Sequence, residues 1–286
     1  MDGKQLSKRK GKRNGRWRVR IKLLLLLVVM LHGCADSFIL FPSTQEENAN
    51  GAQREMIAFG SGNLELYKAK SPGATDAEPE AFMLCFVGNA ARAEWTASWD
   101  AQLWGNRSVE SWTMNYPGYG ASSGPATLRL FPEAGLAAYD HVRRIAGGRP
   151  VFVKGESLGT TVALHVAAHR DVAGVILRAP VPLRRLIMGR FGWYALWIGA
   201  APVAMGVPEA LDAPNSAPLV KAPAILMLIQ TDEIVPVQYQ RIVAEAYGGP
   251  KRLIENCASD HNGPLHAKAQ EELEAAIEWL WQQRRP

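Results

Sequence analysis

Short apolar runs alternate with amphipathic segments along most of this chain, and the alternation limits the folds open to it. Apolar runs of about four to eight residues are typical of buried strands, and the segments between them have the period of helices. Regular alternation of strand and helix predicts a parallel sheet buried on both faces. We therefore expect an α/β fold with a mostly parallel central sheet of about eight strands and helices on both faces.

The pattern places each element. The expected strands lie at residues 55–59, 64–68, 81–87, 109–115, 150–154, 172–178, 224–229 and 251–256. The expected helices lie at residues 91–103, 132–146, 160–169, 237–246 and 264–281. Residues 181–217 interrupt this order with an apolar stretch that holds Phe191, Trp193, Tyr194 and Trp197. The stretch fits a short lid insert or, equally well, a further core helix, because aromatic residues at helical spacing usually pack.

The distribution of charge argues against a nucleic-acid partner. The 286 residues carry a formal charge of +5, but residues 1–33 hold ten of the 32 basic residues and one of the 27 acidic ones. The rest of the chain, with 22 basic and 26 acidic residues, carries −4. Its length suits one large α/β domain, which we expect at residues 54–286.

The N-terminal segment resembles a bacterial lipoprotein signal. A basic run ends at Lys22, and nine uncharged apolar residues follow at 23–31, too few for the about 20 that span a bilayer. The next residues, Leu31-His32-Gly33-Cys34, resemble the lipobox, in which the cysteine receives lipid and becomes the new N-terminus. A plain cleaved signal or an uncleaved anchor is the alternative.

The lipobox resemblance implies a location. Residues 1–33 would be removed, Cys34 would carry the lipid anchor, and the polar residues 34–53 would form a tether. Ala35 stands where many such proteins have the Asp that retains them at the inner membrane. We expect a protein of the bacterial cell envelope, held by lipid at the periplasmic face of the outer membrane.

The cysteines and histidines do not predict a metal site. Cys85 and Cys257 fall on strands that are not expected to be neighbours, so we expect two separate thiols. The chain has no CxxC, and the pair His165 and His169 lacks the adjacent Glu of a zinc-protease helix. We interpret these two histidines as helix-surface residues and expect neither a metal nor a cofactor.

A Gly-x-Ser-x-Gly motif marks the candidate nucleophile, Ser157. The motif follows the apolar run at 151–153 and opens the helix expected at 160–169. A sharp turn from strand to helix strains the serine, and only small neighbours such as Gly155 and Gly159 leave room for it. We expect the Ser157 hydroxyl to be exposed at the carboxyl edge of the sheet.

A serine nucleophile needs a base and an orienting acid. His261 lies in the loop between the last strand and the last helix, whereas His266 falls within that helix. Asp232 follows the strand before the last one, with Glu233 as its rival. The predicted catalytic residues are Ser157, Asp232 and His261.

Acyl transfer also requires hydrogen-bond donors for the oxyanion. The amide of Leu158 is expected to supply the first. The second is expected from the loop after the third strand, from the amide of Ala90 with Asn89 in support.

From about residue 55 to 283 the chain resembles the α/β-hydrolase superfamily, and it is most similar to a single-domain subgroup. Four segments carry the resemblance in order: Val87-Gly88-Asn89-Ala90, with Val87 where His is common, the loop 115–124, Asp232-Glu233-Ile234-Val235-Pro236 and His261-Asn262. The resemblance implies the α/β-hydrolase fold. Members of that subgroup include esterases, thioesterases acting on lipidated proteins and enzymes labelled serine aminopeptidases.

We therefore expect a serine hydrolase that cleaves carboxylic esters or thioesters of a small-molecule or lipid acyl substrate, attached to the membrane by its lipid anchor. A serine peptidase would use the same triad. A noncatalytic envelope lipoprotein that uses the fold for binding is the alternative from another class of protein.

Overall fold

One eight-stranded sheet forms the centre of the computed structural model, which describes residues 35–45, 47–74, 78–192 and 200–284. The strand order is β1-β2-β4-β3-β5-β6-β7-β8. β2 pairs antiparallel with both β1 and β4, and from β4 to β8 all neighbours are parallel. The strands are β1 Gln53–Phe59, β2 Gly62–Lys70, β3 Ala81–Phe86, β4 Val109–Met114, β5 Val151–Glu156, β6 Gly174–Arg178, β7 Ala224–Met227 and β8 Lys251–Ile254.

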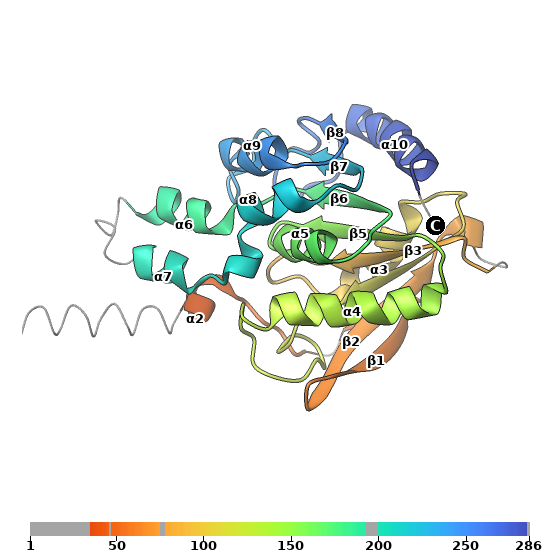
Figure 1. Cartoon of the computed structure of the whole chain (residues 1–286), viewed down its shortest axis with the longest axis horizontal. Coiled ribbons are helices and arrows are strands. Elements are labelled where there is room, and N and C mark those ends of the chain that lie inside the picture. Colours follow the sequence, from red (N-terminus) through yellow and green to blue (C-terminus); the bar gives the residue numbers. More distant parts are fainter. Residues whose placement is uncertain (1–34, 46, 75–77, 193–199, 285–286) are drawn as a thin grey trace, which may run out of the picture.

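Helices cover both faces of the sheet (Figure 1). The helices are α2 Ala35–Ile39, α3 Ala93–Gln102, α4 Phe131–Ala146, α5 Gly159–His169, α6 Leu183–Phe191, α7 Ala200–Gly206, α8 Ala213–Ser216, α9 Val237–Ala246 and α10 Ala267–Gln282. Helices α4, α5 and α9 pack into one apolar core, and α10 packs into a second. The predicted α/β fold with a mostly parallel eight-stranded sheet is confirmed.

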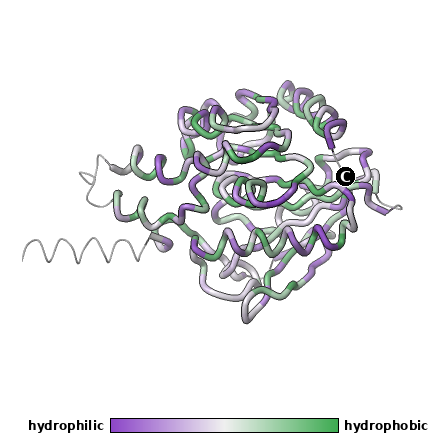
Figure 2. The backbone as a smooth tube through the Cα atoms, in the orientation of Figure 1, coloured by the Kyte–Doolittle hydropathy of each residue, from purple (hydrophilic) through white to green (hydrophobic). Residues whose placement is uncertain are grey.

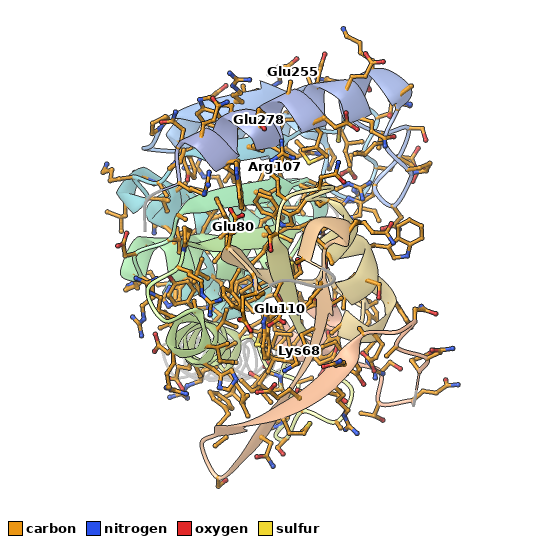
Figure 3. The ribbon with its side chains drawn as sticks, turned by 90° about the vertical axis from the view of Figure 1, so that its right-hand side faces the viewer. Lys68, Glu80, Arg107, Glu110, Glu255 and Glu278 are labelled. Carbon is orange, nitrogen blue, oxygen red and sulfur yellow. The ribbon has the colours of Figure 1, made fainter. Side chains whose placement is uncertain are left out.

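Alternate strand residues supply the two cores. On β3, Leu84 and Phe86 face the first core, whereas Met83 and Cys85 face the second. This is the two-residue period of a strand, and both sets are apolar because both faces of the sheet are buried. Figure 2 shows the resulting hydrophobic strands at the centre of the molecule and helices that alternate between hydrophobic and hydrophilic residues. Side chains also join distant segments on the outside: Arg107 pairs with Glu278 of α10 (Figure 3).

Cys85 and Cys257 are free, buried thiols, as predicted. β3 and β8 are separated in the sheet by three other strands. The prediction that His165 is a helix-surface residue is wrong, because this residue of α5 is buried and only 7% exposed. Helix α5 is central, and every residue from Gly159 to Ala167 is buried.

The end of the chain differs in one detail from the expected helix 264–281. Leu265 forms an isolated antiparallel bridge with Ala258, and the His266 amide donates to the Cys257 carbonyl at 2.9 Å. These bonds hold the residues before Ala267 out of the helix, so His266 precedes α10 instead of lying within it.

Residues 36–45, part of the stretch expected to be a tether, lie against the domain. Leu40 is 5% exposed and belongs to the first core. Asp36 Oδ1 accepts the Leu128 amide at 2.8 Å, and the Ser43 carbonyl accepts the Gly120 amide at 2.9 Å. The described part of this segment is thus ordered by the domain as far as residue 45.

Part of the stretch 181–217 packs into the core, one of the two roles that its sequence allowed, and the lid stays a prediction. Helices α6 and α7 pack against each other and extend beyond the sheet beside α2 (Figure 1). Helix α8 packs against α5 and contributes the buried Ala213 to the first core. The aromatic residues Trp193, Tyr194 and Trp197 lie outside the described residues, as do Cys34 and the expected signal segment before it.

Candidate active site

Ser157 occupies a strained turn between β5 and α5. Its φ is 51°, in the left-handed region that side chains rarely adopt. A Cβ added at Gly159 would lie 2.1 Å from the Phe86 carbonyl oxygen, and one at Gly155 would lie 2.6 Å from the Gly159 carbonyl oxygen. The motif therefore needs both glycines to pass so close to the backbone around it. Ser157 itself is 9% exposed, less than its expected position implied.

His261 and Asp232 form a close pair in two neighbouring loops. The Nδ1 of His261 lies 2.7 Å from Oδ2 of Asp232. The other carboxylate oxygen accepts the amides of Ile234 and Val235, both at 2.8 Å. Asp232 is 5% exposed, whereas its rival Glu233 is exposed to solvent. The carboxylate is thus desolvated and held in one orientation toward the imidazole.

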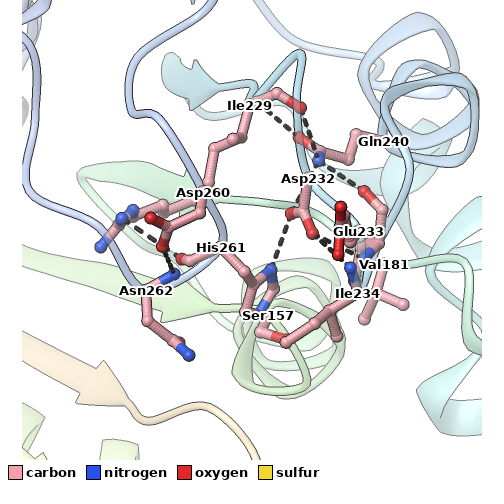
Figure 4. Close-up of polar contacts among 12 residues, drawn as sticks. Ser157, Val181, Ile229, Asp232, Glu233, Ile234, Gln240, Asp260, His261 and Asn262 are labelled. Atoms are coloured by element: carbon pink, nitrogen blue, oxygen red, sulfur yellow. Dashed lines mark hydrogen bonds and ion pairs between the residues drawn. The ribbon is translucent and has the colours of Figure 1, made fainter.

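Figure 4 shows the His261 ring between Asp232 and Ser157. Ser157 and His261 line the same cavity of about 380 Å³. No hydrogen bond joins the Ser157 hydroxyl to His261 in this structure; such contacts are often loose before substrate binds. The parallel strands bring the three residues together, because the loops after β5, β7 and β8 leave the same edge of the sheet.

Two residues that the sequence did not single out support this pair. Gln240 of α9 is fully buried and donates from Nε2 to Asp232 Oδ2 at 3.1 Å. Arg178, the last residue of β6, donates from Nη2 to the carbonyls of His261 at 3.3 Å and Gly263 at 2.6 Å. Its Nη1 donates to Glu156 Oε1 at 2.9 Å. The arginine therefore connects the base loop to the residue beside the nucleophile.

In the loop after β3, the amide of Ala90, which is the expected second oxyanion donor, is engaged in a hydrogen bond. The Ala90 amide donates to Oδ1 of Asn89 at 3.1 Å, and Ala90 has a φ of 62°. Within the described residues the backbone amides of Asn89 and Leu158 have no hydrogen-bond partner. Leu158 borders the turn that holds Ser157, and Asn89 lines the cavity.

The cavity is lined by both apolar and charged residues. Its apolar residues include Phe41, Val87 and Ile234. Among its charged residues, Lys154 donates to Asp100 at 2.7 Å. Burial disfavours the lysine cation, but Asp100 and Glu156 outweigh it and raise the pKa of Lys154. These charges are compensated within the protein, and the surface that they form is unsuited to an apolar group.

The described residues add two observations on cofactors and membranes. Among them no group of three or more His, Cys, Asp or Glu side chains is placed to hold a metal ion. No helix in the described ranges is both long enough and apolar enough to cross a bilayer.

Burial raises the pKa of the Cys85 and Cys257 thiols, which disfavours the reactive thiolate.

Comparison with known proteins agrees with this fold. No family model matches the chain. Human alpha/beta hydrolase domain-containing protein 17B is 33% identical over 96 residues, which is 33% of this chain and 33% of that protein. An esterase from Pyrococcus furiosus superposes with a TM-score of 0.62 at 13% identity, over 86% of this chain and 97% of that one. The acylaminoacyl peptidase of Pyrococcus horikoshii superposes with a TM-score of 0.60 at 14% identity, over 82% of this chain and 42% of that one.

These structural likenesses show that the chain has the α/β-hydrolase fold. The short curated match, which covers about a third of either protein, also supports the α/β-hydrolase superfamily.

Proposed function

We propose that this protein is a serine hydrolase in which Ser157 is the nucleophile, His261 the general base and Asp232 the orienting acid. The observation that carries the proposal is the 2.7 Å contact between His261 Nδ1 and Asp232 Oδ2 beside a serine held at a φ of 51°. A turn of this kind costs free energy, so a strained serine next to a histidine–carboxylate pair favours a catalytic role.

In the proposed reaction His261 Nε2 takes the proton from the Ser157 hydroxyl as the oxygen attacks the substrate carbonyl carbon. Asp232 stabilises the imidazolium that forms. The tetrahedral oxyanion is held by the amides of Leu158 and Asn89, which have no partner within the described residues. His261 then gives its proton to the leaving alcohol or thiol, and an acyl-enzyme remains. A water molecule, activated by the same histidine, hydrolyses it and restores Ser157.

We infer that the substrates are carboxylic esters or thioesters. The apolar residues that line the cavity suit an acyl chain, and an esterase is among the proteins of similar fold. Peptide hydrolysis is the second candidate, because the acylaminoacyl peptidase has a similar fold and a serine peptidase would use the same three residues as this site. This chain spans 42% of the length of that peptidase.

The attachment to the bacterial envelope through Cys34 stays a proposal. It is supported by the basic and apolar runs that precede Leu31-His32-Gly33-Cys34 in the sequence. Extraction with detergent and mass analysis of the mature N-terminus test it, since a lipid on Cys34 adds a defined mass that Cys34→Ser removes.

The proposed function is tested with p-nitrophenyl esters, a matched thioester and an N-acylated peptide, using the purified chain and Ser157→Ala. We expect turnover of the esters, and a loss of at least about 10³-fold in kcat for the variant. Folded wild-type protein that cleaves the peptide alone would favour the peptidase. Turnover of none of them would contradict the proposal.

A further inference from the structure

The segment before the first strand supplies part of the wall of the candidate active site. Phe41 lines the cavity that also holds Ser157 and His261. It comes from residues 36–45, which precede the α/β domain in the sequence and lie against it in the structure. This cavity residue therefore belongs to none of the strands, helices or loops that carry the triad.

Asn89 fixes Phe41 relative to the loop after β3. Its side-chain Oδ1 accepts the Phe41 amide at 3.2 Å, and its Nδ2 donates to the Ile39 carbonyl. Tyr119 donates its hydroxyl to the same Oδ1 at 3.2 Å. One amide side chain thus holds the segment on both sides of Leu40, which is buried in the core. Phe41 therefore has a defined place beside the proposed oxyanion donors.

Arg92 holds the segment a few residues further along. Its guanidinium donates to the carbonyls of Ser43 at 2.9 Å and Gln45 at 2.8 Å. Arg92 is 2% exposed and is paired with Glu94, which is equally buried. A buried arginine with fixed partners is a rigid anchor. With contacts before and after it, the backbone at Phe41 is held in place.

The side chain of Phe41 is nevertheless 61% exposed, while the adjacent Leu40 is 5% exposed. Ile234, which also lines the cavity, is 51% exposed. Two large apolar side chains are thus held open at the rim of a cavity. Covering them with an apolar ligand is favourable, because it removes their surface from water.

The charged residues of the cavity restrict where an apolar chain can lie. Lys154, Asp100 and Glu156 also line the cavity and are joined in ion pairs with each other or with Arg178. An alkyl chain placed against them would desolvate these charges without replacing their water. Contact with the exposed apolar side chains of Phe41 and Ile234 carries no such cost.

We propose that Phe41 forms part of the binding surface for the acyl chain and sets a preference for medium-length over acetyl substrates. This rests on the proposed ester or thioester hydrolysis at Ser157. The N-terminal segment is then a specificity element of the enzyme, in addition to any role in attachment to a membrane.

The test measures kcat/KM for p-nitrophenyl acetate, butyrate, hexanoate and octanoate, each below its micelle concentration, in the full chain. The variants are Phe41→Ala, the milder Phe41→Leu, and Phe38→Ala as the matched control. Phe38 lies in the same segment and is 62% exposed but does not line the cavity. Thermal melts verify that each variant is folded.

We expect Phe41→Ala to lower kcat/KM for the octanoate about tenfold, the scale of covering part of one aromatic side chain, and to leave the acetate within about twofold. Phe41→Leu should fall between, and Phe38→Ala should match wild type. If wild type is active and both Phe41→Ala and Phe41→Leu keep its chain-length profile, the role of Phe41 is overturned, whereas the proposed function is not. A folded wild type that cleaves no ester overturns the proposed function and this inference together.

Discussion

Gln240 and His261 contact the same oxygen atom of Asp232. Gln240 Nε2 lies 3.1 Å from Oδ2 and His261 Nδ1 lies 2.7 Å from it. The Gln240 amide is itself fixed, because it also donates to the Val235 carbonyl at 2.6 Å and its Oε1 accepts the Ile229 amide at 3.0 Å. The orientation of the acid therefore depends on a residue of α9 that does not reach the cavity.

Replacing this glutamine should reduce catalysis without changing substrate binding. We expect Gln240→Leu to lower kcat about tenfold with KM nearly unchanged, because the Asp232 carboxylate loses one of its fixed donors. The free energy of unfolding should fall by about 1–3 kcal/mol, since buried backbone groups lose their partner. Steady-state kinetics and urea unfolding measure the two effects.

Gln238→Leu is the matched control, because Gln238 lies on the same helix and is exposed. It should leave kcat and stability as in wild type. A Gln240→Leu variant with lower stability but wild-type kcat would mean that Gln240 only supports packing and does not position the acid.

Arg178 should be sensitive to a change that keeps its charge. Its guanidinium contacts Glu156 and the carbonyls of His261 and Gly263 at once, a geometry that a lysine ammonium cannot reproduce. We expect Arg178→Lys to lower kcat about tenfold by loosening the loop that carries the base. Arg241→Lys, which alters an exposed pair with Glu255, is the control and should have no effect on kcat. Equal activity of the two variants would contradict a positioning role for Arg178.

His165 should make the protein less stable in mild acid. Burial, with smaller contributions from His169 and Arg170, lowers its pKa from the ordinary 6.5 to about 4. Between these values the unfolded chain binds a proton that the folded chain does not, so stability falls as the pH decreases from about 6.5 towards 4. Its Nδ1 is also buried without a hydrogen bond.

His165→Leu should remove this contribution and flatten the pH dependence of stability in that range. Urea unfolding at several pH values measures it, with His266→Leu at an exposed position as the control. A His165→Leu protein whose stability declines as steeply as that of wild type would show that His165 is not a source of the acid sensitivity.

The sheet was predictable because its strands are buried on both faces. The strand at 151–156 begins with three apolar residues, Val151-Phe152-Val153, as is typical of a strand in a parallel sheet buried on both faces. The boundaries of α9 were predictable because its amphipathic period is regular. The order Ser157, Asp232, His261 along the chain followed from which loops share the carboxyl edge of such a sheet.

Other features depend on contacts that the local sequence does not encode. Gln240 has the polarity of a helix-surface residue, and its burial arises only when α9 packs under the acid loop. Residues 36–45 are polar enough to suggest a tether, but Asn89 and Arg92 bind their backbone carbonyls and amides, which every residue type provides. For Ala90, the left-handed backbone turns its amide toward the Asn89 side chain. A spacing pattern does not reveal that rotation.

The most direct test of the central claim is reaction of the full chain with a fluorophosphonate probe, followed by mass mapping of the modified peptide. The probe phosphonylates a serine hydroxyl only when a base activates it, so it does not depend on knowing the natural substrate. We predict one modified site, Ser157, and no labelling of Ser157→Ala. Folded wild-type protein that remains unlabelled, or that is labelled equally in the variant, would contradict the assignment of Ser157 as an activated nucleophile.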